Sequence, residues 1–191
     1  MVKVGVVLAA TPDDVGEWLA DGAAFEAAGA GALWIDSVAD GALDPLTLTA
    51  ALAAMTHRSL LVTTLPESER PSDSLVRTLV TVGRLSRGRF RVFADAMDIA
   101  EDQIAAGGGF GVFRRISGAA EVFEDVHDPD EPHQWLTVTS PESRSMWRAT
   151  ILDAEERGYT RLMVPANPRL LDILRNSDEP DDRRDLQLAL G

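Results

Sequence analysis

Apolar and polar positions in the first half of the chain fall into two alternating kinds of segment. Short runs of β-branched and other apolar residues are typical of strands buried on both faces of a parallel sheet. These predicted strands are 2–10, 32–38, 59–65 and 89–95. The segments between them repeat apolar residues at helical spacing and begin with capping residues. These predicted helices are 12–28, 44–56 and 72–88. Three strand–helix units followed by a strand predict a parallel sheet with right-handed crossovers.

This alternation changes after residue 95. Residues 97–106 fit one short helix, and two strand-like segments separated by a turn then predict a β-hairpin within 110–126. Residues 127–133 read as a loop. The predicted elements that follow are a strand at 134–139, a helix at 141–158, a strand at 159–165 and a short helix from Pro168. Residues 176–191 are predicted to form an irregular, charged tail.

The element count indicates the fold class. Seven or eight strands and about five helices are fewer elements than a complete eight-fold strand–helix barrel has, and such barrels typically need about 250 residues. We therefore predict a single α/β domain over 1–191, a TIM-like (β/α)8 barrel that is shortened or incomplete. In this prediction a β-hairpin replaces a middle unit, within a divergent region at 96–133.

Composition narrows the function classes. The formal net charge of −13 argues against nucleic acid and anionic membrane as partners, because their phosphates would be repelled. The absence of cysteine excludes disulfides, thiolate metal sites and cysteine nucleophiles. No apolar run reaches the roughly 18 residues of a membrane span. The opening MVKVGVVLAA resembles a buried strand more than a signal peptide, so we expect a cytoplasmic protein.

Several segments, in order, resemble one known family. FEAAGAGALWIDSV, DPLTLTAALAAMT, LVRTLVTVGRLSRGRFRVFAD and GYTRLMVPANPRLLDILRN are similar to segments of the luciferase-like flavin-dependent monooxygenases. Residues 1–95 and 134–191 carry this resemblance. It implies a barrel that binds FMN, or alternatively the deazaflavin coenzyme, at the C-terminal mouth of the strands. It also implies a small organic substrate and a homodimer formed through the second and third helices.

The predicted strand ends supply the candidate ring-binding and catalytic residues, because barrel active sites lie at the C-terminal ends of strands. Asp36 and Asp95 are the candidate catalytic groups, although a carboxylate at a strand end is as often a cap. Thr63 and Thr64 are candidates for contact with the flavin, and by alternation only one of them can face inward. Threonine is also common in strands because of its intrinsic preference for them.

The phosphate end is predicted near the last long helix. Ser140 is expected to cap this helix, with Pro141 at its first position and Arg144 one turn in. Asn167, after the last strand, completes the candidate cofactor-binding residues. An ordinary capped helix would leave the same pattern in the sequence.

Other features weaken the catalytic interpretation. None of the three histidines falls at a predicted strand mouth, and alanines stand where the family commonly has glycines after strand four. Asp95 would also disfavour a reduced flavin unless a cation compensates for its charge. Arg114 and Arg115 are predicted on opposite faces, so one of them could reach the mouth or both could pair with surface acids.

Three functions stay open at this point. The first is a flavin-dependent oxidoreductase or monooxygenase, and the second is a non-catalytic paralogue that binds flavin, or no cofactor, as a partner subunit. An unrelated barrel lyase acting on a phosphorylated metabolite ranks last. No metal site is expected, because no two histidines have ligand spacing.

Overall fold

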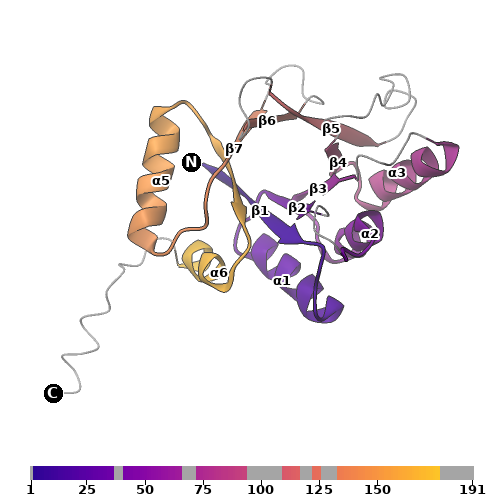
Figure 1. Cartoon of the computed structure of the whole chain (residues 1–191), viewed down its shortest axis with the longest axis horizontal. Coiled ribbons are helices and arrows are strands. Elements are labelled where there is room, and N and C mark those ends of the chain that lie inside the picture. Colours follow the sequence, from indigo (N-terminus) through magenta and orange to yellow (C-terminus); the bar gives the residue numbers. More distant parts are fainter. Residues whose placement is uncertain are drawn as a thin grey trace.

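A computed structural model describes residues 2–36, 41–65, 72–93, 109–116, 122–125 and 133–176. Eight strands form a closed barrel in chain order (Figure 1). The strands are β1 (Lys3–Ala9), β2 (Ala32–Asp36), β3 (Leu60–Thr64), β4 (Phe90–Phe93), β5 (Phe110–Arg115), β6 (Val122–Asp125), β7 (His133–Thr137) and β8 (Arg161–Pro165). The described helices are α1 (Val15–Ala27), α2 (Pro45–Met55), α3 (Asp73–Leu85), α5 (Arg144–Glu156) and α6 (Pro168–Arg175).

Strand direction confirms the parallel sheet predicted for the first half of the chain. β1 to β5 pair in parallel, and β8 pairs in parallel with both β7 and β1. β6 runs the other way and is antiparallel to β5 and β7. The predicted helix at 97–106 and the turn between β5 and β6 lie outside the described residues. His133 begins β7, so the prediction that it belongs to a loop was wrong.

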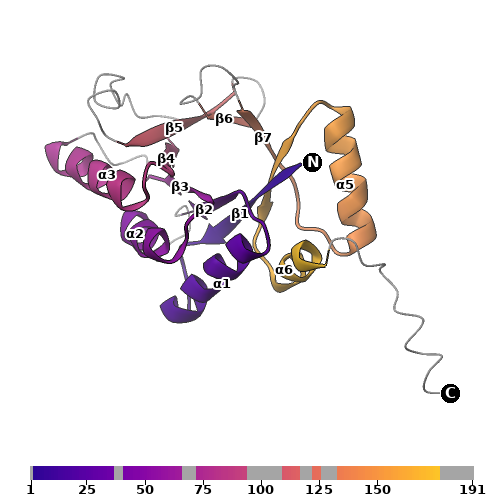
Figure 2. The ribbon, with the colours of Figure 1, turned by 180° about the vertical axis from the view of Figure 1, so that it is seen from behind.

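The described helices surround most of the barrel. Figures 1 and 2 show α5, α6, α1, α2 and α3 following one another around it, while no described helix lies over β6. The fold is therefore an α/β closed barrel, and its described part holds fewer helices than a complete TIM barrel, as the element count predicted. Among the described helices, none combines the length and the apolarity that a membrane crossing requires.

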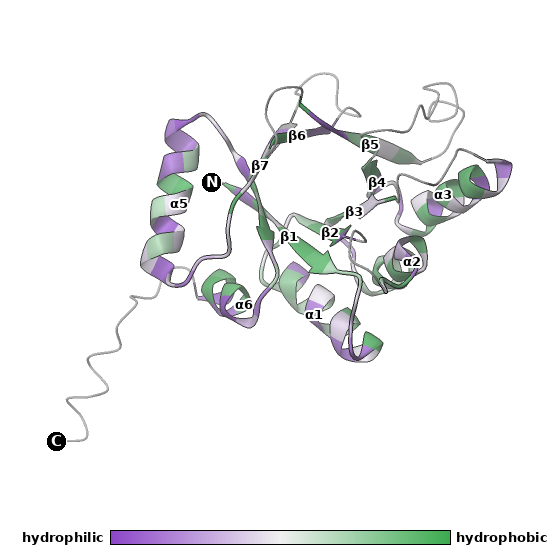
Figure 3. Cartoon of the chain, viewed as in Figure 1, coloured by the Kyte–Doolittle hydropathy of each residue, from purple (hydrophilic) through white to green (hydrophobic). Residues whose placement is uncertain are grey.

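Figure 3 shows that hydrophobic residues dominate β1 and β2. Because side chains alternate between the two faces of each strand, the core divides into two layers. An outer layer joins the strands to the helices and includes Val6, Leu33 and Leu61. An inner layer fills the barrel, and its buried members are Ala32, Trp34, Val62, Phe93, Phe113, Trp135 and Met163. The interior of the barrel is thus a packed, largely aromatic core.

The start of α5 differs from the prediction. Ser143 is the N-cap, because its Oγ accepts a hydrogen bond from the backbone N–H of Met146 at 3.1 Å, and the helix begins at Arg144. Ser140 does not cap it. Its hydroxyl instead donates to the carbonyl oxygen of Pro165 at 2.8 Å, which ties the segment after β7 to the end of β8.

A buried carboxylate joins α1 to the segment before β3. Glu26 accepts hydrogen bonds of 2.8 Å from the backbone N–H groups of His57, Arg58 and Ser59. Burial alone would raise the pKa of Glu26, but these N–H groups stabilise the carboxylate more strongly and lower the pKa from 4.5 to about 2. Arg89 binds the carbonyl oxygens at the end of α2 and lies close enough to attract the carboxylate.

An ion pair lies inside the barrel, in the half nearer the N-terminal ends of the parallel strands. Arg91 is in register with the inward-facing Val62, and its Nε contacts both carboxylate oxygens of Asp125 at 3.1 Å. The residue of β5 beside Arg91 is Gly111, which has no side chain between the two charged groups. The side chains of Arg91 and Asp125 are only 12% and 4% exposed, so the pair is buried.

Candidate functional site

Aromatic side chains from three strands meet at the C-terminal mouth of the barrel. The ring centroid of Trp34 lies 5.2 Å from that of Phe93 and 4.9 Å from that of Phe123. Phe93 and Phe123 are 5.3 Å apart in a T-shaped arrangement. We call these three residues the aromatic platform. Because the rings hold one another in tilted and edge-to-face packing, the platform is a rigid apolar cluster in which Trp34 and Phe93 are buried and Phe123 is partly exposed.

Arg115 lies against this platform. It is the last residue of β5, and its guanidinium carbon is 5.8 Å from the ring centroid of Phe93 and 5.6 Å from that of Phe123. Such distances allow cation–π attraction. Arg114 is beside Glu124 in the register and therefore on the opposite face. Of the two arginines, Arg115 is thus the one that reaches the mouth.

The two threonines of β3 have different surroundings. Thr64 accepts a hydrogen bond of 2.7 Å from the indole Nε1–H of Trp34, so it belongs with the aromatic platform. Thr63 points outward, is fully buried and shares a short hydrogen bond with the hydroxyl of Thr49 on α2. Thr63 therefore faces α2, and Thr64 is the one of the two threonines that faces the barrel interior.

Of the two candidate catalytic carboxylates, Asp36 can be placed. It ends β2 two residues after Trp34, so the two side chains share the inner face of the strand. Asp36 is half-buried, and its carbonyl oxygen accepts from the backbone N–H of Ala10 at 2.9 Å. Asp95 lies outside the described residues.

The predicted phosphate-binding residues gather where the segment between β7 and α5 meets α6. Arg144 Nη2 lies 2.7 Å from the carboxylate of Asp172 on α6. Arg169 Nη1 donates to the carbonyl oxygen of Glu142 at 2.6 Å. Asn167 caps α6 by accepting from the backbone N–H of Leu170 at 2.6 Å. These residues and Ser140 form what we call the rim cluster.

The rim cluster has features that suit an anion and others that do not. The first N–H groups of α5 lack partners within the helix, and two guanidinium groups lie close to that end. Asp172 already pairs with Arg144, however, and the Oδ1 of Asn167 is taken by its capping bond. An incoming phosphate would have to compete with Asp172 for Arg144.

Sequence reasoning missed three features of the site. Arg169, in the first turn of α6, was overlooked although it lies only four residues after the end of β8. The aromatic platform could have been suspected from aromatic residues at inward positions of β2, β4 and β6. Arg115 was considered, but the sequence did not show whether it or Arg114 faces the mouth. Within the part of the chain that the structure describes, no three or more histidines, aspartates or glutamates are grouped to hold a metal ion.

No protein-family model matches the sequence, and no curated protein matches it either. Among solved structures, the chain is similar to riboflavin lyase (RcaE), crystallised with modified FMN and the substrate riboflavin, with 22% identity and a TM-score of 0.44. It is also similar to long-chain alkane monooxygenase (LadA), with 16% identity and a TM-score of 0.42. These alignments cover 56% and 48% of the present chain but only 32% and 30% of those two chains. Both similarities are partial, and the function is therefore inferred from this chain's own residues.

Proposed function

We propose that this chain is a shortened relative of the luciferase-like flavin-dependent monooxygenases and binds a flavin at the C-terminal mouth of its barrel. The observation that carries the proposal is Arg115 beside the aromatic platform. In this proposal the planar flavin ring lies over the mouth against the partly exposed Phe123, beside the positive charge of Arg115. The sequence resemblance over 1–95 and 134–191 supports the same class.

The residues at the mouth fit the ring system of a flavin. The platform supplies an apolar, aromatic boundary to the mouth, and Thr64 fixes the orientation of Trp34 within it. Arg115 supplies the cation that a reduced, negatively charged ring needs when a carboxylate such as Asp36 is near. A bound flavin would supply the electron-transfer or oxygen chemistry, while the chain supplies orientation and exclusion of water around a small organic substrate.

The rim cluster is our proposed site for the phosphate of FMN. Arg144 and Arg169 lie near the start of α5, where helix N–H groups and the helix dipole favour an anion. Ser140 and Asn167 shape the same rim. The deazaflavin coenzyme also carries phosphate and is the alternative cofactor.

The antiparallel strand β6 supports the finer proposal about the fold. β5 and β6 pair side by side in opposite directions, as the two strands of a hairpin do. We propose that this pair replaces a strand–helix unit of a complete barrel. The replacement brings Phe123, from the start of β6, to the mouth.

A second function, flavin binding without turnover as a partner subunit, is favoured by a specific observation. Arg144 is paired with Asp172, and Asp36 is the one candidate catalytic carboxylate that the described residues hold. A protein that binds FMN but does not oxidise reduced nicotinamide cofactor with any tested acceptor would have this second function.

Two arginine variants separate the ring site from the phosphate site. Arg115→Gln is expected to weaken FMN and riboflavin alike by about threefold to fivefold, since it removes an exposed cation that lies against the aromatic rings. Arg144→Gln is expected to weaken FMN by about tenfold and to leave riboflavin unchanged, because riboflavin has no phosphate. Fluorescence titration of each flavin measures both effects.

The matched control is Arg157→Gln, which removes an exposed arginine at the far end of α5. It should bind both flavins as the unaltered protein does. Equal losses for Arg157→Gln and Arg115→Gln, or unchanged riboflavin binding in Arg115→Gln, would contradict the assignment of the ring site.

We also propose a homodimer formed through α2 and α3. The 11 residues of α2 include no charged side chain. Met55 at its end is 46% exposed, and Leu85 at the end of α3 is 54% exposed. An uncharged outer face with large apolar side chains at its edge suits burial against a second copy.

Met55→Glu and Leu85→Glu are each expected to convert the dimer to a monomer, because a buried unpaired carboxylate would oppose association. Light scattering after size-exclusion chromatography should give twice the chain mass of 20.6 kDa for the unaltered protein and the single mass for these variants. Leu152→Glu, at an exposed apolar position of α5, is the control and should stay dimeric. A monomeric unaltered protein would refute the proposal.

A further inference from the structure

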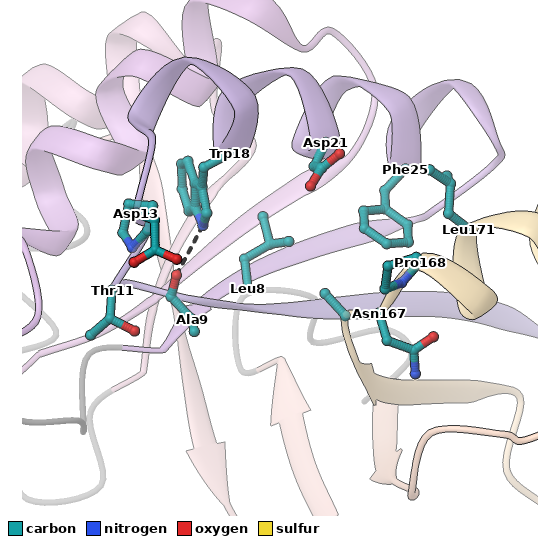
Figure 4. A pocket seen from close by; sticks show the side chains of 12 residues that line it. Leu8, Ala9, Thr11, Asp13, Trp18, Asp21, Phe25, Asn167, Pro168 and Leu171 are labelled. Atoms are coloured by element: carbon teal, nitrogen blue, oxygen red, sulfur yellow. Dashed lines mark hydrogen bonds between the residues drawn. The ribbon is translucent and has the colours of Figure 1, made fainter.

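A pocket of about 420 Å³ lies outside the barrel wall, between α1 and α6 (Figure 4). Its deeper part is apolar and is formed by Leu8, Trp18, Phe25 and Leu171. Leu8 belongs to the layer of the core that faces the helices, so the pocket is separate from the aromatic platform inside the mouth. The volume is in the range of small-molecule sites.

The walls of the pocket are fixed by hydrogen bonds. The indole N–H of Trp18 donates to the carbonyl oxygen of Ala9 at 2.9 Å, which holds the ring against the end of β1 (Figure 4). Asn167 fixes the first turn of α6 through its bond to Leu170. Because both sides are held by their own contacts, the pocket does not need a ligand to form it.

The charged residues that line the pocket are both negative. Asp13 and Asp21 are exposed at its edge, and the other polar lining residues, Thr11 and Asn167, are neutral. None of the 12 lining residues is basic. Figure 4 shows Asp21 extending from α1 between Trp18 and Phe25. A positive group above Leu8 would thus meet carboxylates and two aromatic rings, and both attract cations.

We propose that this pocket binds a small amphipathic organic cation, an amine with an aromatic or aliphatic body. The apolar body occupies the space among Leu8, Phe25 and Leu171, and the ammonium group lies between Asp13 and Asp21. The charge pattern discriminates against carboxylates and phosphates, because both aspartates would repel them. The proposal does not depend on flavin binding at the mouth.

The test compares three probes of similar shape by isothermal titration calorimetry at low salt. The probes are 2-phenylethylamine, which is protonated at neutral pH, neutral 2-phenylethanol, and anionic phenylacetate. We expect the amine to bind most tightly and phenylacetate not to bind. Asp21→Asn should weaken the amine by about threefold to fivefold, as for a partly exposed ion pair, and should leave 2-phenylethanol unchanged.

Glu17→Gln is the matched control, since it removes a carboxylate from the same helix without altering the pocket lining. It should bind the amine normally. A bulky variant, Leu171→Trp, should abolish binding of both the amine and the alcohol by filling the pocket. Equal affinity for all three probes, an equal loss in Glu17→Gln, or unaltered amine binding in Leu171→Trp would overturn the proposal.

Discussion

Replacing Arg91 by methionine is expected to lower the free energy of unfolding by about 3–5 kcal/mol, the usual cost of removing one member of a buried ion pair. The Asp125 side chain is 4% exposed and would lose the guanidinium that contacts both of its oxygens. Chemical denaturation at neutral pH measures the loss. The effect is large because the Asp125 carboxylate is almost fully buried, so water solvates it poorly.

Two further variants identify the cause of this loss. Arg91→Met combined with Asp125→Leu should recover most of it, because an apolar pair needs no charge compensation. Arg157→Met breaks an exposed pair with Asp153 and should cost no more than about 1 kcal/mol. A double variant as unstable as Arg91→Met, or a loss of about 1 kcal/mol in Arg91→Met itself, would show that the interior pair is not buried as described.

Replacing Glu26 by glutamine is expected to lower the free energy of unfolding by about 3 kcal/mol at neutral pH. This is the stability that corresponds to the lowering of the Glu26 pKa from 4.5 to about 2. The carboxylate accepts hydrogen bonds from the N–H groups of His57, Arg58 and Ser59, and a neutral amide accepts them less strongly. Because the folded pKa lies below the unfolded one, this contribution is complete above about pH 4.5 and is lost as the pH falls toward 2.

Denaturation of both proteins at several pH values tests this dependence. The difference in stability between the unaltered protein and Glu26→Gln should shrink steadily below about pH 4.5. Glu156→Gln, at an exposed position of α5, is the control and should match the unaltered protein throughout. A difference that stays constant from neutral pH to pH 3 would contradict the assigned role of the carboxylate.

Much of the scaffold follows from local sequence signals. Asp44 with Pro45 predicted the start of α2, and the β-branched runs predicted β1 to β4 within a few residues. The start of α5 did not follow, since Ser140 and Ser143 both suit a cap. The hydrogen bond from Ser140 to Pro165, 25 residues away, sets them apart. A contact so distant in sequence leaves no trace in the local pattern.

The candidate site was less predictable for a related reason. β3 is buried on both faces, so its sequence has no polar side that would show which of Thr63 and Thr64 points inward. The platform joins β2, β4 and β6, and its geometry depends on the reversed direction of β6. Arg115 reaches Phe123 only because β5 and β6 are paired in that register.

The central claim is that the mouth of this barrel binds a flavin through the aromatic platform and Arg115. Its most direct test is the visible absorption spectrum of FMN during titration with the purified full chain. We predict a saturable spectral shift in the micromolar range that Arg115→Gln weakens and Arg157→Gln leaves unchanged. The claim would be contradicted if the FMN spectrum did not change at tens of micromolar protein and riboflavin and the deazaflavin coenzyme also failed to bind.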